Sequence, residues 1–207
     1  MGVYELSGAG SLKTPRTVYS SMNAGNQYGA MVPIASATAT GSSGTFSFEN
    51  IPATYQDLYA VIQVRSDTST VTSRSNELRV LLNNSFTGYS NTRLIGDGAS
   101  AQSARDTSQS SIWAGYIPIA TDTAGIFAVQ SFHILNYANT STYKTVLYRA
   151  ALDKNSSSTN GNGTTMLGVG LWQNTSAVNV FRVDTFGFGN YVTGSTATLY
   201  GIRAVSS

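Results

Sequence analysis

The single histidine of the chain, His133, is the first candidate for acid–base chemistry. It lies in the segment SFHIL, where Phe132 and Ile134 are predicted to point to the opposite face of a strand. A triad hydrolase needs a histidine base beside a nucleophile and an orienting acid, and no Gly-x-Ser-x-Gly elbow accompanies this histidine. We therefore interpret His133 as a structural residue.

Carboxylates are the second candidates, because glycosidases need two of them facing each other across a cleft. Ten are present, but most lie in polar, turn-like segments, where aspartate caps backbone amides. Asp184 shares a predicted strand face with Arg182, and we interpret the two as a structural ion pair. The loop that begins with Asp153 and Asn155 resembles a calcium loop only loosely, since it lacks the turn glycine and the closing glutamate. The sequence thus predicts no catalytic residue, no metal site, no cofactor and no enzymatic activity.

Aromatic side chains are better candidates for binding, because ring faces stack on the apolar faces of sugars. Trp113 and Trp172 lie within apolar runs and are expected in the core. Tyr89 and Tyr137 stand beside loops rich in serine and asparagine, which favours surface positions. They are our candidate receptor-facing residues, with a role in the core as the alternative for both.

The composition indicates a folded chain with few charges. Hydrophobic residues make up 41% of the chain, enough for a core, whereas charged residues make up only 11%. Basic residues exceed acidic ones by 12 to 10 and are spread along the sequence, so no nucleic-acid partner is expected. The absence of cysteine excludes disulfides and thiolate chemistry. We find no signal-peptide pattern and no apolar stretch of membrane-spanning length, and expect synthesis in a host cytoplasm without a membrane partner.

Segments with strand periodicity follow one another from residue 45 onward. LYAVIQVRS, for example, alternates Leu58, Ala60, Ile62 and Val64 with a second set of side chains. The predicted strands are 45–49, 58–66, 77–82, 89–95, 112–117, 126–137, 144–152, 166–172, 178–186 and 196–204. Turn-forming clusters separate them, and no segment holds a helical period for three turns. This pattern predicts an all-β fold, with a jelly-roll-like antiparallel β-sandwich as our first choice.

The N-terminal part differs from the rest of the chain. Residues 10–33 have no sustained period, and the small-residue run 35–44 contains two glycine breakers. We therefore expect an extended arm and linker over residues 1–43 and the β-sandwich over residues 44–207. Aromatic, methionine and arginine side chains are enriched in interface cores, so such residues are our candidates for docking the arm to a partner. They are Arg16, Tyr19, Met22, Tyr28 and Met31. The alternative is a leader that packs on its own domain.

Several segments follow one another in a familiar order. They are FENIPATYQDLYAVIQVRSD, LRVLLNN with YSNTRLIGDGAS, GYIPIATDTAGIFAVQSFHILNY, LGVGLWQNTSAVNVFRVD and ATLYGIRA. This order resembles a family of small bacteriophage virion proteins, which occur as head-decoration or fibre components and as tail-fibre domains. The resemblance covers residues 44–204, with NIPATYQDL and the closing LYGI as its best markers. It implies a jelly-roll-like β-sandwich, a non-enzymatic structural role and trimeric assembly, and it carries over no catalytic residue.

We therefore expect a virion structural protein, either a head decoration or a fibre. Its arm would dock on other virion structural proteins of the capsid or tail, and its sandwich would be exposed on the virion surface as a homotrimer. The alternative is a tail-fibre receptor-binding module, similar to a lectin, that recognises host surface glycans. A glycan hydrolase is a third hypothesis, since sandwich folds can carry carboxylate pairs.

Overall fold

The computed structural model describes residues 6–7, 11–12, 30–69, 76–155 and 163–204. Its strands are β1 (Leu6–Ser7), β2 (Ser11–Leu12), β3 (Met31–Thr38), β4 (Thr45–Phe48), β5 (Asp57–Val64), β6 (Asn76–Leu82), β7 (Tyr89–Gly96), β8 (Ala101–Gln109), β9 (Ile112–Ile117), β10 (Ala128–Leu135), β11 (Lys144–Asp153), β12 (Gly163–Trp172), β13 (Phe181–Asp184) and β14 (Thr196–Ile202). No helix occurs among the described residues.

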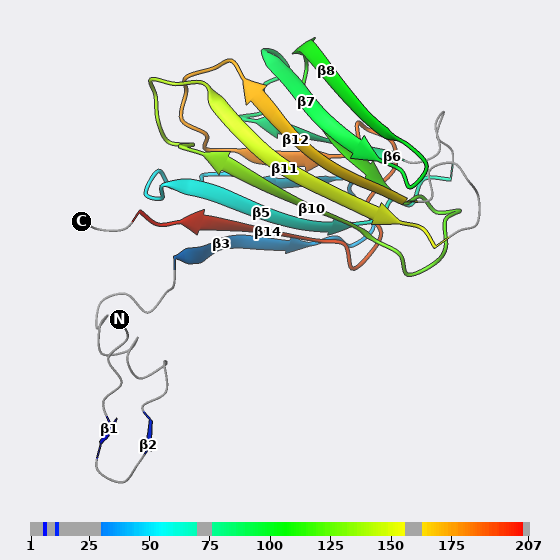
Figure 1. The fold of residues 1–207 in the computed structure, drawn as a ribbon, viewed down its shortest axis with the longest axis horizontal. Coiled ribbons are helices and arrows are strands. Elements are labelled where there is room, and N and C mark those ends of the chain that lie inside the picture. Colours follow the sequence, from blue (N-terminus) through cyan, green and yellow to red (C-terminus); the bar gives the residue numbers. More distant parts are fainter. Residues whose placement is uncertain (1–5, 8–10, 13–29, 70–75, 156–162, 205–207) are drawn as a thin grey trace.

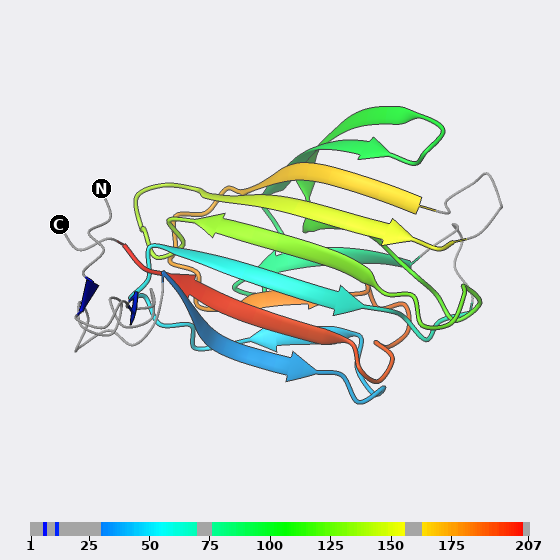
Figure 2. The same cartoon turned by 60° about the horizontal axis from the view of Figure 1, so that its bottom comes forward.

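Two antiparallel sheets of unequal width form a β-sandwich, as the sequence predicts. The large sheet has the strand order β3-β14-β5-β10-β11-β12-β7-β8, and the small sheet has the order β4-β13-β6-β9. Figure 1 looks onto the large sheet, with the small sheet behind it, and Figure 2 shows both layers from a tilted view. Strand β9 of the small sheet packs against β10, β11, β12 and β7 of the large sheet.

The core lies between the two sheets, because alternate residues of each strand point inward. Leu58, Ala60, Ile62 and Val64 of β5 are all fully buried, which confirms the predicted alternation in that strand. Phe132 of β10 is likewise fully buried in the same cluster. Each large apolar side chain removed from water in this way contributes about 1.5–3 kcal/mol before the cost of ordering the chain.

Two strands of the large sheet lie where the sequence predicts an arm, a linker or a turn. Strand β3 falls within residues 31–38 and pairs with β14, so the prediction that the sandwich begins at residue 44 is wrong. Strand β8, in a segment rich in serine, pairs with β7. Both are edge strands of the large sheet. Such strands are held by backbone hydrogen bonds and bury few side chains, so they lack the apolar alternation by which strands are recognised.

Tyr89 and Tyr137 are core residues, so the prediction that they face a receptor is wrong. Both rings are almost completely buried. The Tyr89 hydroxyl accepts a hydrogen bond from the Leu82 amide at 2.9 Å and donates one to the Leu82 carbonyl at 3.3 Å. The Tyr137 hydroxyl donates to the Pro52 carbonyl and accepts from the Tyr55 amide at 3.3 Å. Tyrosine can be buried because the backbone satisfies its hydroxyl, and neighbouring polar loops give no sign of this.

Gly168 of β12 makes room for the ring of Tyr148 on the neighbouring strand β11. The two residues are directly opposite each other, and both lie on the inner face. A Cβ atom built on Gly168 would lie 2.2 Å from Cζ of Tyr148, closer than any real contact. The glycine is therefore required at this position for packing.

Gly168→Ala should destabilise the protein by about 1–3 kcal/mol, because the ring of Tyr148 must shift within a packed core. Gly96→Ala is the matched control, since Gly96 also lies in a strand of the large sheet and its added Cβ would meet no atom within 4 Å. The measurement is the urea concentration at the midpoint of unfolding. It reports stability when the unfolding free energies of the variants depend equally steeply on urea. Equal midpoints for the two variants would contradict the close packing described here.

The buried tyrosines also make stability depend on pH at the alkaline end. Burial raises the pKa of Tyr89 to about 12, with the Leu82 hydrogen bond opposing it in part, and burial raises the pKa of Tyr148 to about 12. In the unfolded chain both hydroxyls ionise near pH 10. The stabilisation is therefore fully present below pH 10 and is lost as the pH rises from about 10 to about 12.

Urea unfolding at a series of pH values from about 9 to about 11.5 measures this loss. Tyr89→Phe should reduce the decline in unfolding free energy across that range, because one of the ionising groups is removed. The comparison uses the pH dependence of each protein, so a constant destabilisation of the variant does not affect it. An identical decline in both proteins would show that Tyr89 does not contribute.

Candidate binding surface

The outer face of the large sheet, which is turned away from the small sheet, carries an unusual number of exposed aliphatic side chains. We call five of them the outer patch: Val61 (37% exposed), Val129 (48%), Leu147 (44%), Leu167 (55%) and Leu94 (60%). They come from the five neighbouring strands β5, β10, β11, β12 and β7. In β5, β11 and β12 the residues on either side of these aliphatic ones point inward to the core, so these three strands carry apolar residues on both faces.

Strand register places a charged residue in the middle of the outer patch. Arg149 of β11 lies directly between Ser131 of β10 and Leu167 of β12, and Leu167 is in turn opposite Leu94 of β7. On its own strand, Arg149 follows Leu147 by two residues and therefore points to the same face. The exposed guanidinium is thus bordered by aliphatic side chains on its own strand and on β12.

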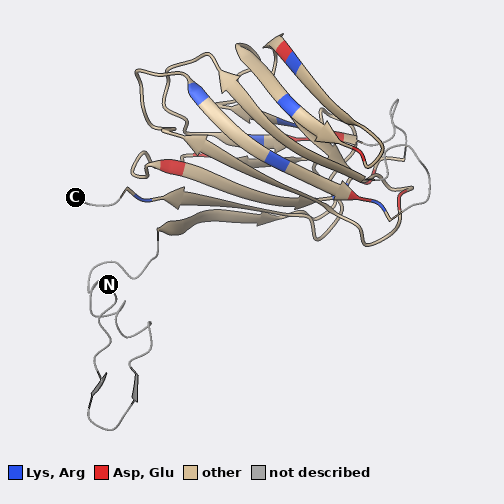
Figure 3. Ribbon diagram, viewed as in Figure 1, with Lys and Arg blue, Asp and Glu red and all other residues tan. Residues whose placement is uncertain are grey.

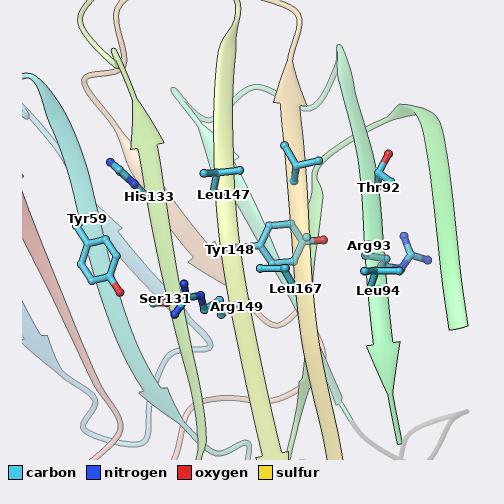
Figure 4. Close-up of a pocket in the computed structure, with 12 residues that line it drawn as sticks. Tyr59, Thr92, Arg93, Leu94, Ser131, His133, Leu147, Tyr148, Arg149 and Leu167 are labelled. Atoms are coloured by element: carbon cyan, nitrogen blue, oxygen red, sulfur yellow. The ribbon is translucent and has the colours of Figure 1, made fainter. Parts of the chain in front are cut away.

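A hollow of about 530 Å³ lies on this part of the outer face. Figure 4 shows Leu147, Arg149 and Leu167 over its centre, with Tyr59 and His133 on one side and Leu94 on the other. Five adjacent strands, β5, β10, β11, β12 and β7, contribute its lining. The hollow is therefore a property of the sheet surface and needs no loop to form it.

His133 lies at one side of this hollow, paired with a carboxylate. Its Nε2 atom is 3.0 Å from Oδ2 of Asp57, and the other oxygen of Asp57 accepts the Asn136 amide at 2.8 Å. The imidazole also contacts the ring of Tyr59 edge-on, with centroids 6.2 Å apart. Phe132 and Ile134 point into the core on the opposite face, as predicted from the sequence. The pairing joins β5 to β10 and occupies Nε2, one of the two ring nitrogens of the histidine.

An ion pair lies on the inner side of the sheet, behind the outer patch. Arg93 of β7 pairs with Asp106 of β8, and its guanidinium lies 4.5 Å from the centroid of the Trp113 ring. Arg93 is directly opposite Gly168, the residue that accommodates Tyr148. The burial that raises the pKa of Tyr148 is opposed in part by the positive charge of Arg93. This pair helps to hold the β7–β8 hairpin against the sandwich.

Asp184 is held by two arginines on the small sheet. Its carboxylate is 2.6 Å from Nε of Arg79 and 2.9 Å from Nη2 of Arg182. The predicted pairing with Arg182 is confirmed. Arg79 in turn lies over the rings of Phe86 and Phe186, with centroid distances of 5.3 and 5.0 Å. The carboxylate is buried and engaged, which fits a structural role.

The other predicted site residues lie apart from the outer patch or outside the described part. Arg16, Tyr19, Met22 and Tyr28 lie outside the described residues. Met31, the fifth arm candidate, begins β3 and is exposed at the edge of the large sheet. In the loop compared with calcium sites, Oδ1 of Asp153 accepts the Asn155 amide at 2.8 Å. No group of three or more potential metal ligands occurs among the residues that the structure describes.

The outer patch was not predicted from the sequence, although the sequence contains a signal for it. One face of an antiparallel sheet is commonly solvated, and its strands then alternate apolar with polar residues. In LYAVIQV, TVLYRAAL and MLGVGLW, apolar residues occur at both parities. Three such strands close together in one sheet indicate an apolar outer face, but the sequence does not show that the strand order brings them together.

Comparisons with known proteins give no relative for this chain: no family model, no curated protein and no solved structure matches it. Among the described residues, none forms a helix that would cross a bilayer. The outer patch and its hollow are therefore the candidate functional site on geometric grounds alone.

Proposed function

We propose that this protein is a non-enzymatic structural protein of a bacteriophage virion, a head decoration or fibre. Residues preceding β3 anchor it to other virion proteins, and the sandwich, of jelly-roll type, is displayed on the particle surface. The observation that carries the proposal is the outer patch, an apolar sheet face on a sandwich with few charges. Contiguous exposed apolar surface is typical of protein–protein contact sites.

The side chains on which an enzymatic hypothesis would depend are engaged in structural contacts. His133 is paired with Asp57, and Asp184 is paired with Arg79 and Arg182. Because the Asp57–His133 and Arg79–Asp184 pairs join neighbouring strands, they have a structural role that needs no substrate. This supports a structural role over the glycan hydrolase.

The order of sequence segments that resembles phage virion proteins supports the same proposal. Within this proposal the protein assembles as a homotrimer, and its docking partners are capsid or tail components. A chain with few charges and no cysteine suits a particle surface, because its stability is independent of the redox state of the surroundings.

A tail-fibre module that binds host glycans is the second candidate. Tyr89 and Tyr137 are buried and do not serve as contact residues for a glycan. The hollow on the outer face offers the ring of Tyr59 instead, beside Ser131 and Arg149. A ring with hydrogen-bonding groups around it is the arrangement that sugars require. Binding of host surface polysaccharide that is lost in Tyr59→Ala would favour this candidate over the first.

Gold-labelled antibodies against this protein should label phage particles purified from lysates that contain it. We expect label over the heads, because a decoration is distributed over the capsid surface. Particles from the same host infected with a phage that lacks this chain are the control. Label confined to tail tips would favour the receptor-binding candidate, and particles without label would contradict the virion proposal.

A further inference from the structure

We propose that the outer patch docks an extended protein segment that carries a carboxylate between aliphatic side chains. The inference concerns the chemistry of this surface alone. It does not depend on the virion proposal, because the same surface would select the same partner in any assembly.

The apolar part of the surface spans five strands. Adjacent strands lie about 4.8 Å apart, so the outer patch extends over about 19 Å from β5 to β7. Its five aliphatic side chains are between 37% and 60% exposed. Covering them with a partner removes this area from water, which favours binding in proportion to the apolar area buried.

The charged part of the surface is positive. Arg149 is exposed, and none of the described residues pairs with it. Arg105 of β8 is also exposed and points to the same outer face, opposite Thr92 of β7. Arginine presents its donors in a planar fork that matches a carboxylate, and hydrocarbon neighbours strengthen such a pair by excluding water.

Among the residues that the structure describes, no free carboxylate near the outer patch neutralises this charge. Asp57 is engaged by His133 and by the Asn136 amide. Asp153 lies at the end of β11 and accepts the Asn155 amide. Figure 3 shows how sparse the charged residues are along the strands of the large sheet. A partner with its own carboxylate therefore complements this face, and a basic partner does not.

The kind of side chain favours a protein over a sugar. Sugars stack on aromatic rings. Among the residues of the hollow that point to the outer face, Tyr59 and His133 carry rings, and the His133 ring is paired with Asp57, whereas Leu94, Leu147 and Leu167 are aliphatic. An extended segment places every second side chain on one face, so two leucines and an aspartate can reach the patch together. We therefore commit to a protein segment as the occupant.

The test uses the full chain and short fluorescent peptides that place their contacting residues on one face. The first peptide is Leu-Ser-Leu-Ser-Asp-Ser-Leu-Ser-Leu. The second carries Lys in place of Asp, and the third carries Ser in place of every Leu. We expect the first peptide to bind most tightly by fluorescence anisotropy. Its advantage over the second should be about fivefold or more, the effect expected of one partly desolvated ion pair.

Two variants separate the charge from the apolar area. Arg149→Glu should reverse the preference, so that the Lys peptide binds more tightly than the Asp peptide. Leu147→Ser combined with Leu167→Ser should weaken the Asp peptide by more than about tenfold, because two apolar contacts are lost. Phe188→Ser is the matched control, since Phe188 is 60% exposed but lies in the loop after β13, outside the outer patch. It should bind the Asp peptide as the unaltered protein does.

Other occupants give different outcomes. If the unaltered protein self-associates in sedimentation velocity and the double leucine variant does not, a second copy covers the outer patch and the proposal is wrong. Equal affinity for the Asp and Lys peptides would overturn it as well. Binding of polysaccharide without binding of any peptide would assign the face to sugars instead. None of these results depends on whether antibodies label a phage particle.

Discussion

The structure depends on one constraint: a sheet of eight strands is covered on one side by a sheet of only four. Inward-facing side chains of β5, β10, β11 and β12 find partners on the small sheet, and the core is concentrated there. The edge strands β3 and β8 extend beyond this cover. They are held mainly by backbone pairing, which explains why small and polar residues suffice in them.

Close packing beneath the central strands fixes the surface above them. Gly168 lets the ring of Tyr148 lie across β12. In the same row, Arg93 of the next strand, β7, stacks on the Trp113 ring of β9 in the small sheet. These inner contacts hold β11, β12 and β7 in one register. The same register brings Arg149, Leu167 and Leu94 together on the outer side. The arrangement of the candidate site is thus a consequence of how the core is packed.

The charged residues divide into two groups with different roles. Asp57, Asp106 and Asp184 are each engaged by a basic side chain that ties strands together. Arg149, in contrast, is exposed among aliphatic side chains on the outer face. A chain with so few charges leaves this arginine as a prominent feature of an apolar surface. Such a combination is more useful for recognising a partner than for stabilising the fold, because an exposed single charge contributes little to stability.

The all-β class, most of the strands and the inward face of strands such as β5 follow from the order of residues alone, because they depend on a period of two in that order. The same order also predicts the pairing of Arg182 with Asp184, which are two residues apart on one strand. That β3 and β8 are strands is evident only from the fold, since edge strands carry little apolar signal. The fold alone shows that Tyr89 and Tyr137 lie in the core, where backbone groups of Leu82 and Pro52 satisfy their hydroxyls. The outer patch was decided in the same way: its members are scattered from Val61 to Leu167, and strand order and register alone make them neighbours.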